Sequence, residues 1–199
     1  MARRHAPFRA LFPALILAAS LLWAAAPAQA QTANACPDIL LGDSLAEGMG
    51  PYARELGFEV IAKNGAGISW LRTQAPRCAR RLVLVFGTND LRGMDADSYL
   101  AQIVQVLQGW DAQQIIWATP GCFSQDSQLD RSSQALERAL TRIRRSPERT
   151  LDLPAINNGR EARCSYPSRD GIHPATGMAY RAWWLGLAEV LQRNRLPGT

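Results

Sequence analysis

The segment that most constrains the fold is RLVLVF at residues 81–86, which is apolar from its second residue onward. A strand with one solvated face alternates apolar and polar residues, whereas a strand buried on both faces is apolar throughout. Both faces of a sheet become covered when helices connect parallel strands. The run therefore predicts a central strand of a parallel sheet with helices on each side.

The segments around this run alternate between strand and helix patterns. Strands are predicted at residues 38–41, 58–62, 81–86, 114–118 and 150–153, and helices at 45–56, 95–110, 132–145 and 175–194. In the last helix, Trp183 and Trp184 are expected to belong to the core rather than to a ligand platform. The alternation predicts an α/β fold, a flavodoxin-like three-layer α/β/α sandwich whose five-stranded, mainly parallel sheet has the strand order 2-1-3-4-5.

The N-terminus has the pattern of a secretory signal peptide. Arginines within the first nine residues precede an apolar stretch at residues 11–26, and AQA at 28–30 matches a cleavage site. The alternative is an uncleaved membrane anchor, although the stretch is short for a transmembrane helix. We therefore expect residues 1–30 to be a cleaved signal peptide and residues 31–199 to form a single domain. The mature protein would be periplasmic or extracellular, with no stable membrane span.

The charge of the chain does not favour nucleic acid as a partner. The leader contains three arginines and no acidic residue, so its removal lowers the formal charge from +5 to +2. No basic run with interleaved aromatic residues occurs, and such runs are typical of nucleic-acid binding. The pattern leaves the oligomeric state open.

Four cysteines, Cys36, Cys78, Cys122 and Cys164, follow the leader. An even number in an exported chain indicates two disulfides, with three possible pairings. Metal binding is the weaker alternative, because the chain has no C-x-x-C pair. In the expected strand order, Cys36 and Cys78 precede neighbouring strands, whereas the other two follow strands at the opposite end of the sheet. We therefore predict Cys36–Cys78 and Cys122–Cys164, each adding roughly 4 kcal/mol in the chain-entropy model.

Two short motifs contain the residue types of a hydrolytic triad. Ser44 follows the first predicted strand, and His173 is the only histidine beyond the leader. A serine hydroxyl is a poor nucleophile until a base takes its proton, and histidine suits that task near neutral pH. Asp170, three residues before His173, can accept a hydrogen bond from the other ring nitrogen. The alternative for Asp170 is a turn-capping aspartate before Gly171.

Four motifs in order resemble the blocks of the SGNH hydrolases, also called the GDSL esterase/lipase family. They are Gly42-Asp43-Ser44-Leu45, Gly67 within residues 64–69, Gly87-Thr88-Asn89-Asp90, and Asp170-Gly171-Ile172-His173-Pro174. The resemblance extends over residues 39–174 and implies the SGNH hydrolase fold. The first three motifs follow predicted strands and the last loop can reach the same edge, where ligands bind in such sheets.

The resemblance also implies an oxyanion hole. Its donors would be the backbone N–H of Ser44, the backbone N–H of Gly67 and the side-chain amide of Asn89, and loss of one donor costs roughly 3 kcal/mol of barrier. Gly65 is the local alternative to Gly67, and a loop cap is the alternative role for Asn89. Asp43 and Asp90 are expected to hold loops rather than to react.

The activity implied by the resemblance is that of a serine esterase with an acyl-enzyme on Ser44 and no metal or organic cofactor. A compact domain without a long lid favours short-chain or acetyl esters, including those of carbohydrates. Longer acyl chains, as in a lipase, lysophospholipase or thioesterase, are the alternative. An acyltransferase and a non-catalytic binding module on the same fold also remain. Four residues after the active-site turns are candidates for the substrate pocket: Trp70, Leu91, Met94 and Phe123.

Overall fold

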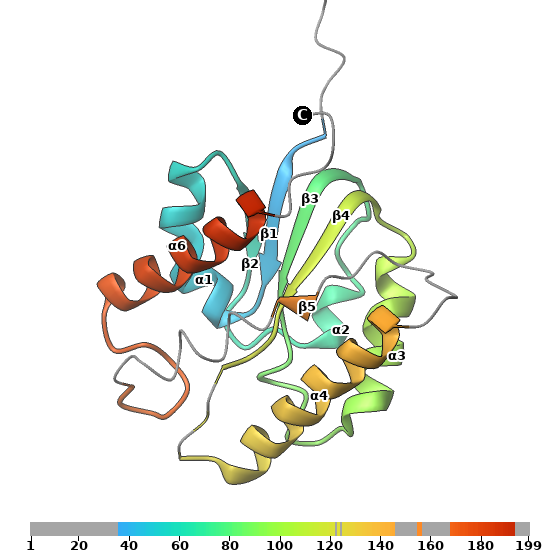
Figure 1. Ribbon diagram of the computed structural model, residues 1–199, viewed down its shortest axis with the longest axis vertical. Coiled ribbons are helices and arrows are strands. Elements are labelled where there is room, and N and C mark those ends of the chain that lie inside the picture. Colours follow the sequence, from blue (N-terminus) through green and yellow to red (C-terminus); the bar gives the residue numbers. More distant parts are fainter. Residues whose placement is uncertain (1–35, 122, 124, 146–154, 157–167, 194–199) are drawn as a thin grey trace, which may run out of the picture. The chain divides into compact units, whose positions relative to one another are not determined.

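A parallel sheet with the order β2-β1-β3-β4-β5 forms the centre of the structure (Figure 1). The computed structural model describes residues 36–121, 123, 125–145, 155–156 and 168–193, which belong to one compact unit. The strands are β1 (Asp38–Gly42), β2 (Glu59–Ala62), β3 (Cys78–Val85), β4 (Asp111–Ala118) and the two-residue β5 (Ala155–Ile156). The helices are α1 (Ser44–Glu55), α2 (Ile68–Leu71), α3 (Ala96–Leu107), α4 (Ser127–Arg145) and α6 (Gly177–Arg193). The predicted fold class and strand order are confirmed.

One face of the sheet packs against α1 and α6. Leu40, Val83 and Ile116 project from the central strands into a core with Trp183 and Trp184 of α6. Both tryptophans are fully buried, as expected from the sequence. The burial of these large rings fixes α6, whose N-terminal end follows the His173 loop, against the sheet.

The opposite face packs against α2, α3 and α4, as Figure 1 shows. Ile39, Leu82 and Leu84 project to this side because successive side chains of a strand alternate between the two faces. Trp117 of β4 is fully buried here, and its ring nitrogen donates a hydrogen bond to the Phe86 carbonyl at 3.0 Å. The two apolar cores explain why the central strands read as continuous apolar runs.

Several elements differ from their predicted bounds. β3 begins at Cys78, three residues before the apolar run, because its first residue pairs with Asp111 of β4. α4 begins at Ser127 rather than at 132, since the Asp126 carboxylate accepts a hydrogen bond from the Leu129 N–H at 2.9 Å. α2 was not predicted, because four residues are too few to show helical periodicity.

The predicted fifth strand at residues 150–153 lies outside the described residues. The fifth strand of the structure is at 155–156, where Ala155 pairs with Trp117 of β4. A strand of two residues is too short to show an alternation of apolar and polar side chains in the sequence.

The predicted disulfide between Cys36 and Cys78 is present, with their Cα atoms 5.4 Å apart. It joins the chain before β1 to the first residue of β3, which are neighbouring strands. The two cysteines can pair because β1 and β3 are parallel neighbours whose first residues lie at the same edge of the sheet. The other predicted disulfide, Cys122–Cys164, lies outside the described residues.

Beside this disulfide, Asp38 forms ion pairs with two arginines of β3. Its Oδ1 accepts hydrogen bonds from Arg80 Nε at 2.9 Å and Arg81 Nε at 3.0 Å. Burial alone would raise the pKa of Asp38, but these hydrogen bonds and positive charges lower it below its ordinary value. A buried carboxylate is thus tolerated at the start of β1 because it is paired.

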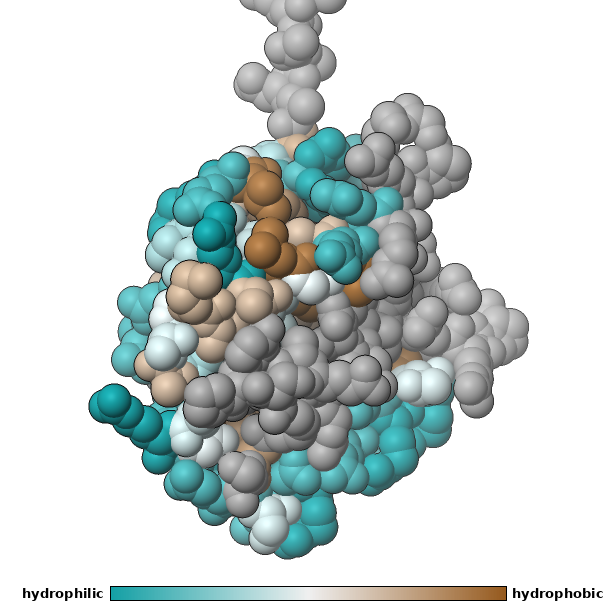
Figure 2. All heavy atoms as spheres, turned by 60° about the vertical axis from the view of Figure 1, so that its left-hand side comes forward, coloured by the Kyte–Doolittle hydropathy of each residue, from teal (hydrophilic) through white to brown (hydrophobic). Residues whose placement is uncertain are grey.

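None of the described helices is long and apolar enough to cross a membrane. Among the residues with described side chains, the exposed large apolar ones are Leu56, Met178 and Leu185. Figure 2 shows small groups of hydrophobic atoms interspersed with hydrophilic ones on the face that it presents. Scattered apolar exposure of this kind is normal for a folded domain. The predicted leader at residues 1–30 lies outside the described residues.

Candidate active site

The turns that follow β1, β2 and β3 meet at the carboxyl edge of the sheet. Ser44 comes two residues after β1, Gly67 follows β2, and Asn89 follows β3. The loop before α6 brings His173 to Ser44, 129 positions away in the sequence. The carboxyl edge of a parallel sheet is where such folds bind ligands.

Ser44 is positioned by the start of α1. Asp43 caps this helix, since its Oδ1 accepts a hydrogen bond from the Leu45 N–H at 2.9 Å and its carbonyl accepts one from the Glu47 N–H at 3.0 Å. Within the described part of the chain, the Ser44 N–H donates no hydrogen bond. The serine hydroxyl and a free N–H donor are therefore held together at a helix N-terminus, the positive end of the helix dipole.

Ser44, His173 and Asp170 form one hydrogen-bonded chain. The Ser44 Oγ lies 2.8 Å from His173 Nε2, and His173 Nδ1 lies 2.6 Å from Asp170 Oδ2. When the carboxylate accepts the Nδ1–H, the unprotonated Nε2 faces the serine hydroxyl. The structure thus brings together the three side chains of the predicted triad in the order required for proton transfer.

The Asp170 carboxylate is fixed by its own loop. Its Oδ1 accepts hydrogen bonds from the N–H groups of Ile172 at 2.8 Å and His173 at 2.7 Å, and from the Ser168 hydroxyl at 3.0 Å. Gly171, with φ of +72°, supplies the left-handed residue of this turn. Burial tends to raise the pKa of Asp170, but the hydrogen bond from the His173 ring and those from the backbone hold it well below its ordinary value.

These contacts show that the two interpretations of Asp170 are compatible. Oδ1 caps the turn before His173, which is the alternative role of Asp170, and Oδ2 faces the imidazole, which is its role in the triad. Ser168 was not singled out from the sequence, because a serine in an irregular segment carries no periodic or spacing signal. Its contact with Asp170 appears only when the loop is folded.

The Asn89 side chain contacts the peptide group that joins Ala66 to Gly67. The Asn89 Nδ2 donates a hydrogen bond to the Ala66 carbonyl at 2.8 Å. A trans peptide points its N–H and C=O in opposite directions, so this bond fixes the direction of the Gly67 N–H. Among the described residues, the second N–H of the Asn89 amide has no acceptor. Gly65, with φ of +69°, forms the preceding turn.

Asp43 is a second carboxyl group close to the triad. Its side chain is fully buried, and burial raises its pKa to about 7 despite the hydrogen bond from Leu45. The negative charge of Asp90 adds to the rise, whereas His173 opposes it. Asp43 therefore lies beside Ser44 as a buried carboxyl group whose contact with the Leu45 N–H caps α1.

The four candidate pocket residues divide into two pairs. Leu91 and Phe123 are each 1% exposed and belong to the core beneath α3 and α4, so in this structure they offer no surface to a substrate. Their apolar side chains are buried because the turns that carry them fold back onto the sheet. Trp70 and Met94 are partly buried against the same core and keep some exposed surface.

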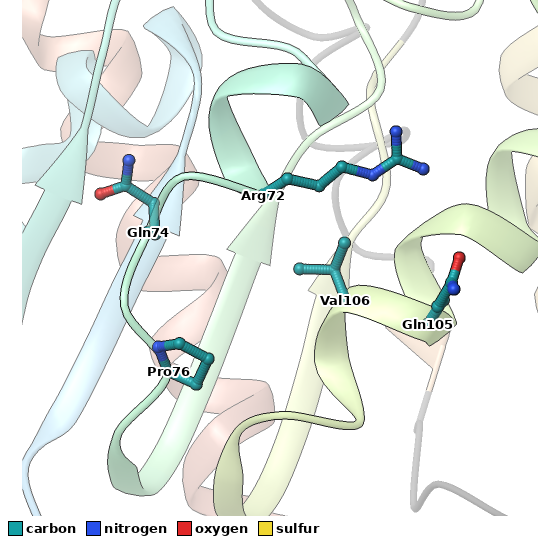
Figure 3. A pocket seen from close by; sticks show the side chains of 5 residues that line it. All are labelled: Arg72, Gln74, Pro76, Gln105 and Val106. Carbon is teal, nitrogen blue, oxygen red and sulfur yellow. The ribbon is translucent and has the colours of Figure 1, made fainter.

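A hollow of about 390 Å³ lies between the α2–β3 connection and α3 (Figure 3). It is lined by Arg72, Gln74, Pro76, Gln105 and Val106. No residue of the Ser44–His173–Asp170 chain contributes to it. Among the residues with described side chains, no group of three or more His, Cys, Asp or Glu is placed to hold a metal ion.

Protein-family models give no match to this chain. Curated proteins give none either. Solved structures, in contrast, match over most of the chain.

One similar structure is a member of the lipolytic G-D-S-L family from Veillonella parvula, with 17% identity and a TM-score of 0.59 over 80% of this chain and 100% of that one. Another is the C-terminal catalytic domain of peptidoglycan O-acetyltransferase A from Streptococcus pneumoniae, with 14% identity and a TM-score of 0.61 over 80% and 94% of the two chains. A third is a catalytic mutant of an acetylxylan esterase from Geobacillus stearothermophilus, with 14% identity and a TM-score of 0.53 over 78% and 94%. The chain therefore has the SGNH hydrolase fold.

Proposed function

We propose that the protein is a serine ester hydrolase that forms an acyl-enzyme on Ser44. The observation that carries this proposal is the continuous chain of short contacts from Ser44 Oγ through the His173 ring to Asp170. Such an arrangement serves to activate a hydroxyl, because the imidazole accepts its proton while the carboxylate stabilises the resulting imidazolium. General-base assistance of this kind is typically worth roughly 10²- to 10⁴-fold in rate.

In the first half-reaction, Ser44 Oγ attacks the ester carbonyl carbon as its proton passes to His173 Nε2. The tetrahedral intermediate collapses when His173 returns the proton to the leaving alcohol, which leaves the acyl group on Ser44. In the second half-reaction, His173 takes a proton from water, and the hydroxide attacks the acyl-enzyme. The second tetrahedral intermediate collapses as His173 gives that proton to Ser44 Oγ, which releases the acid and restores the Ser44 hydroxyl. The proposed reaction therefore requires no metal or organic cofactor.

The negative charge on the former carbonyl oxygen needs hydrogen-bond donors that are already in place. The proposed donors are the N–H groups of Ser44 and Gly67 and the second N–H of the Asn89 amide. The first two have no acceptor within the described part of the chain, which leaves them able to donate to substrate. At Gly67 there is no side chain to obstruct close approach of the substrate.

The proposed substrates are short-chain or acetyl esters, with a carbohydrate O-acetyl group as the favoured case. Two of the similar structures are described as an acetylxylan esterase and a peptidoglycan O-acetyltransferase. The burial of Leu91 and Phe123 leaves Trp70 and Met94 as the candidate apolar surface for an acyl group. Both side chains are partly buried, and we propose that they contact a short acyl group.

The test uses p-nitrophenyl esters from acetyl to palmitoyl, with and without added alcohol. We expect the highest kcat/KM between acetyl and butyryl, and free carboxylic acid as the main product. A preference for palmitoyl would instead indicate a lipase. Transfer of the acyl group to the added alcohol would indicate an acyltransferase, the activity of the Streptococcus pneumoniae relative. Absence of turnover with every ester would favour a binding module.

We also propose that the protein is exported before it acts. The support is the leader pattern at residues 1–30 together with the Cys36–Cys78 disulfide, since disulfides persist in oxidising compartments. Expression of the full chain in a bacterial host with an export pathway should yield a mature protein that begins at Gln31. Intact-mass analysis of the periplasmic fraction and medium checks this. Recovery of the unprocessed chain in the membrane fraction would contradict it.

A further inference from the structure

Two peptide groups flank the Cα atom of Gly67, and three of their four polar groups are hydrogen-bonded. The Ala66 carbonyl accepts from Asn89 Nδ2 at 2.8 Å, and the Gly67 carbonyl accepts from the Leu71 N–H at 3.1 Å. The Ile68 N–H donates to both oxygens of Asp90, at 3.2 and 3.1 Å. The fourth group is the Gly67 N–H, which donates to no described residue. Both peptides are thus held in place while one donor is left open.

Asp90 supplies the contact on the far side of Gly67. The short helix α2 starts with Gly67 as its cap, a residue that has no side chain to bind the first N–H groups. The Asp90 carboxylate, from the turn after β3, takes over this task across 22 positions of sequence. Its fit is close, since a Cβ atom on Gly67 would lie 2.5 Å from Asp90 Oδ1. A glycine is therefore required at 67 for the carboxylate to reach the Ile68 N–H.

We propose that Asp90 is a positioning residue that directs the Gly67 N–H toward the oxyanion formed during ester cleavage. This inference rests on the proposed esterase function. Asn89 fixes the peptide that precedes the Gly67 Cα, and Asp90 fixes the one that follows it, so consecutive residues of one turn orient the donor from both sides. Without Asp90, the Gly67–Ile68 peptide loses its only side-chain acceptor among the described residues, and only the hydrogen bond from the Leu71 N–H to the Gly67 carbonyl still restrains it.

The test compares Asp90→Ala and Asp90→Asn with the parent enzyme on p-nitrophenyl acetate. We expect Asp90→Ala to lower kcat by roughly 10- to 100-fold with KM changed by less than about twofold, because a misdirected donor affects the transition state more than the bound ester. Asp90→Asn should recover at least half of this loss on a logarithmic scale, since its amide oxygen still accepts the Ile68 N–H.

A boronic acid separates positioning from a general loss of structure. Methylboronic acid forms a tetrahedral adduct with a reactive serine and so resembles the intermediate. Its inhibition constant should rise in Asp90→Ala by about the same factor by which kcat falls. The matched control is Asp95→Ala, which removes a carboxylate that caps α3 through the Ser98 N–H at 2.9 Å, away from the site. It should lower the melting temperature without changing kcat.

The outcomes distinguish this inference from the proposed function. If Ser44→Ala is inactive but Asp90→Ala keeps parental kcat and boronate affinity, the inference is wrong and the esterase proposal stands. If Ser44→Ala keeps full activity, the esterase proposal itself is wrong. If Asp90→Ala does not fold, Asp90→Leu replaces it, because leucine keeps the branched shape of the side chain but offers the Ile68 N–H no acceptor. Parental kcat in Asp90→Leu together with unchanged boronate affinity then overturns the inference, whereas a parallel reduction in both supports it.

Discussion

Replacing His173 with alanine is expected to lower kcat for p-nitrophenyl acetate by on the order of 10⁴-fold or more. Among the described side chains, only His173 hydrogen-bonds to the Ser44 hydroxyl, through its Nε2 at 2.8 Å. No other described side chain can therefore serve as the base. Without His173, the hydroxyl keeps its proton and is a weak nucleophile at neutral pH. Steady-state kinetics on the purified variant measure the loss.

Ser44→Ala should be equally inactive, and the double variant should be no worse than either single one. The two residues act on the same proton transfer, so their effects do not add. Ser127→Ala is the matched control, because Ser127 is the first residue of α4 as Ser44 is of α1, and we expect it to keep parental activity. Circular dichroism should show folded protein in all variants. Full activity in His173→Ala would exclude the proposed mechanism.

The sheet, and the edge at which Ser44 and Asn89 lie, can be predicted from the sequence because both follow from burial patterns. Buried parallel strands are visible as apolar runs such as residues 81–86, and crossover helices set the edge at which their loops gather. Ser44 and Asn89 each follow a parallel strand, so both lie at the carboxyl edge of the sheet. The Cys36–Cys78 pairing could be predicted for the same reason.

What the sequence did not reveal are contacts between polar groups of different turns. The bond from Asn89 to the Ala66 carbonyl and the bond from the Ile68 N–H to Asp90 depend on how two loops approach each other. No period or spacing encodes such an approach. Ser168 was missed for this reason. The positions of Leu91 and Phe123 after the turns of the site predict a pocket role, but their apolar side chains turn inward to the core.

Replacing Asp170 with asparagine is expected to lower kcat by on the order of 10⁴-fold while leaving the fold unchanged. The reason lies in the loop that surrounds Asp170 Oδ1. Three donors, the N–H groups of Ile172 and His173 and the Ser168 hydroxyl, require an acceptor at that position. The amide of Asn must therefore place its oxygen there and turn its NH₂ group toward His173 Nδ1, where the native carboxylate oxygen lies at 2.6 Å.

An NH₂ group in that position reverses the roles of the imidazole. Nδ1 must then accept a hydrogen bond, so the neutral ring carries its proton on Nε2 and can no longer accept one from Ser44. Asp170→Ala imposes no such tautomer, and because the Asp170 side chain is 52% exposed, water can reach Nδ1 in its place. We therefore expect the alanine variant to be more active than the asparagine variant, although it lacks three of the loop contacts. Equal kcat in the two variants would mean that the carboxylate acts through its charge alone and not by selecting the tautomer.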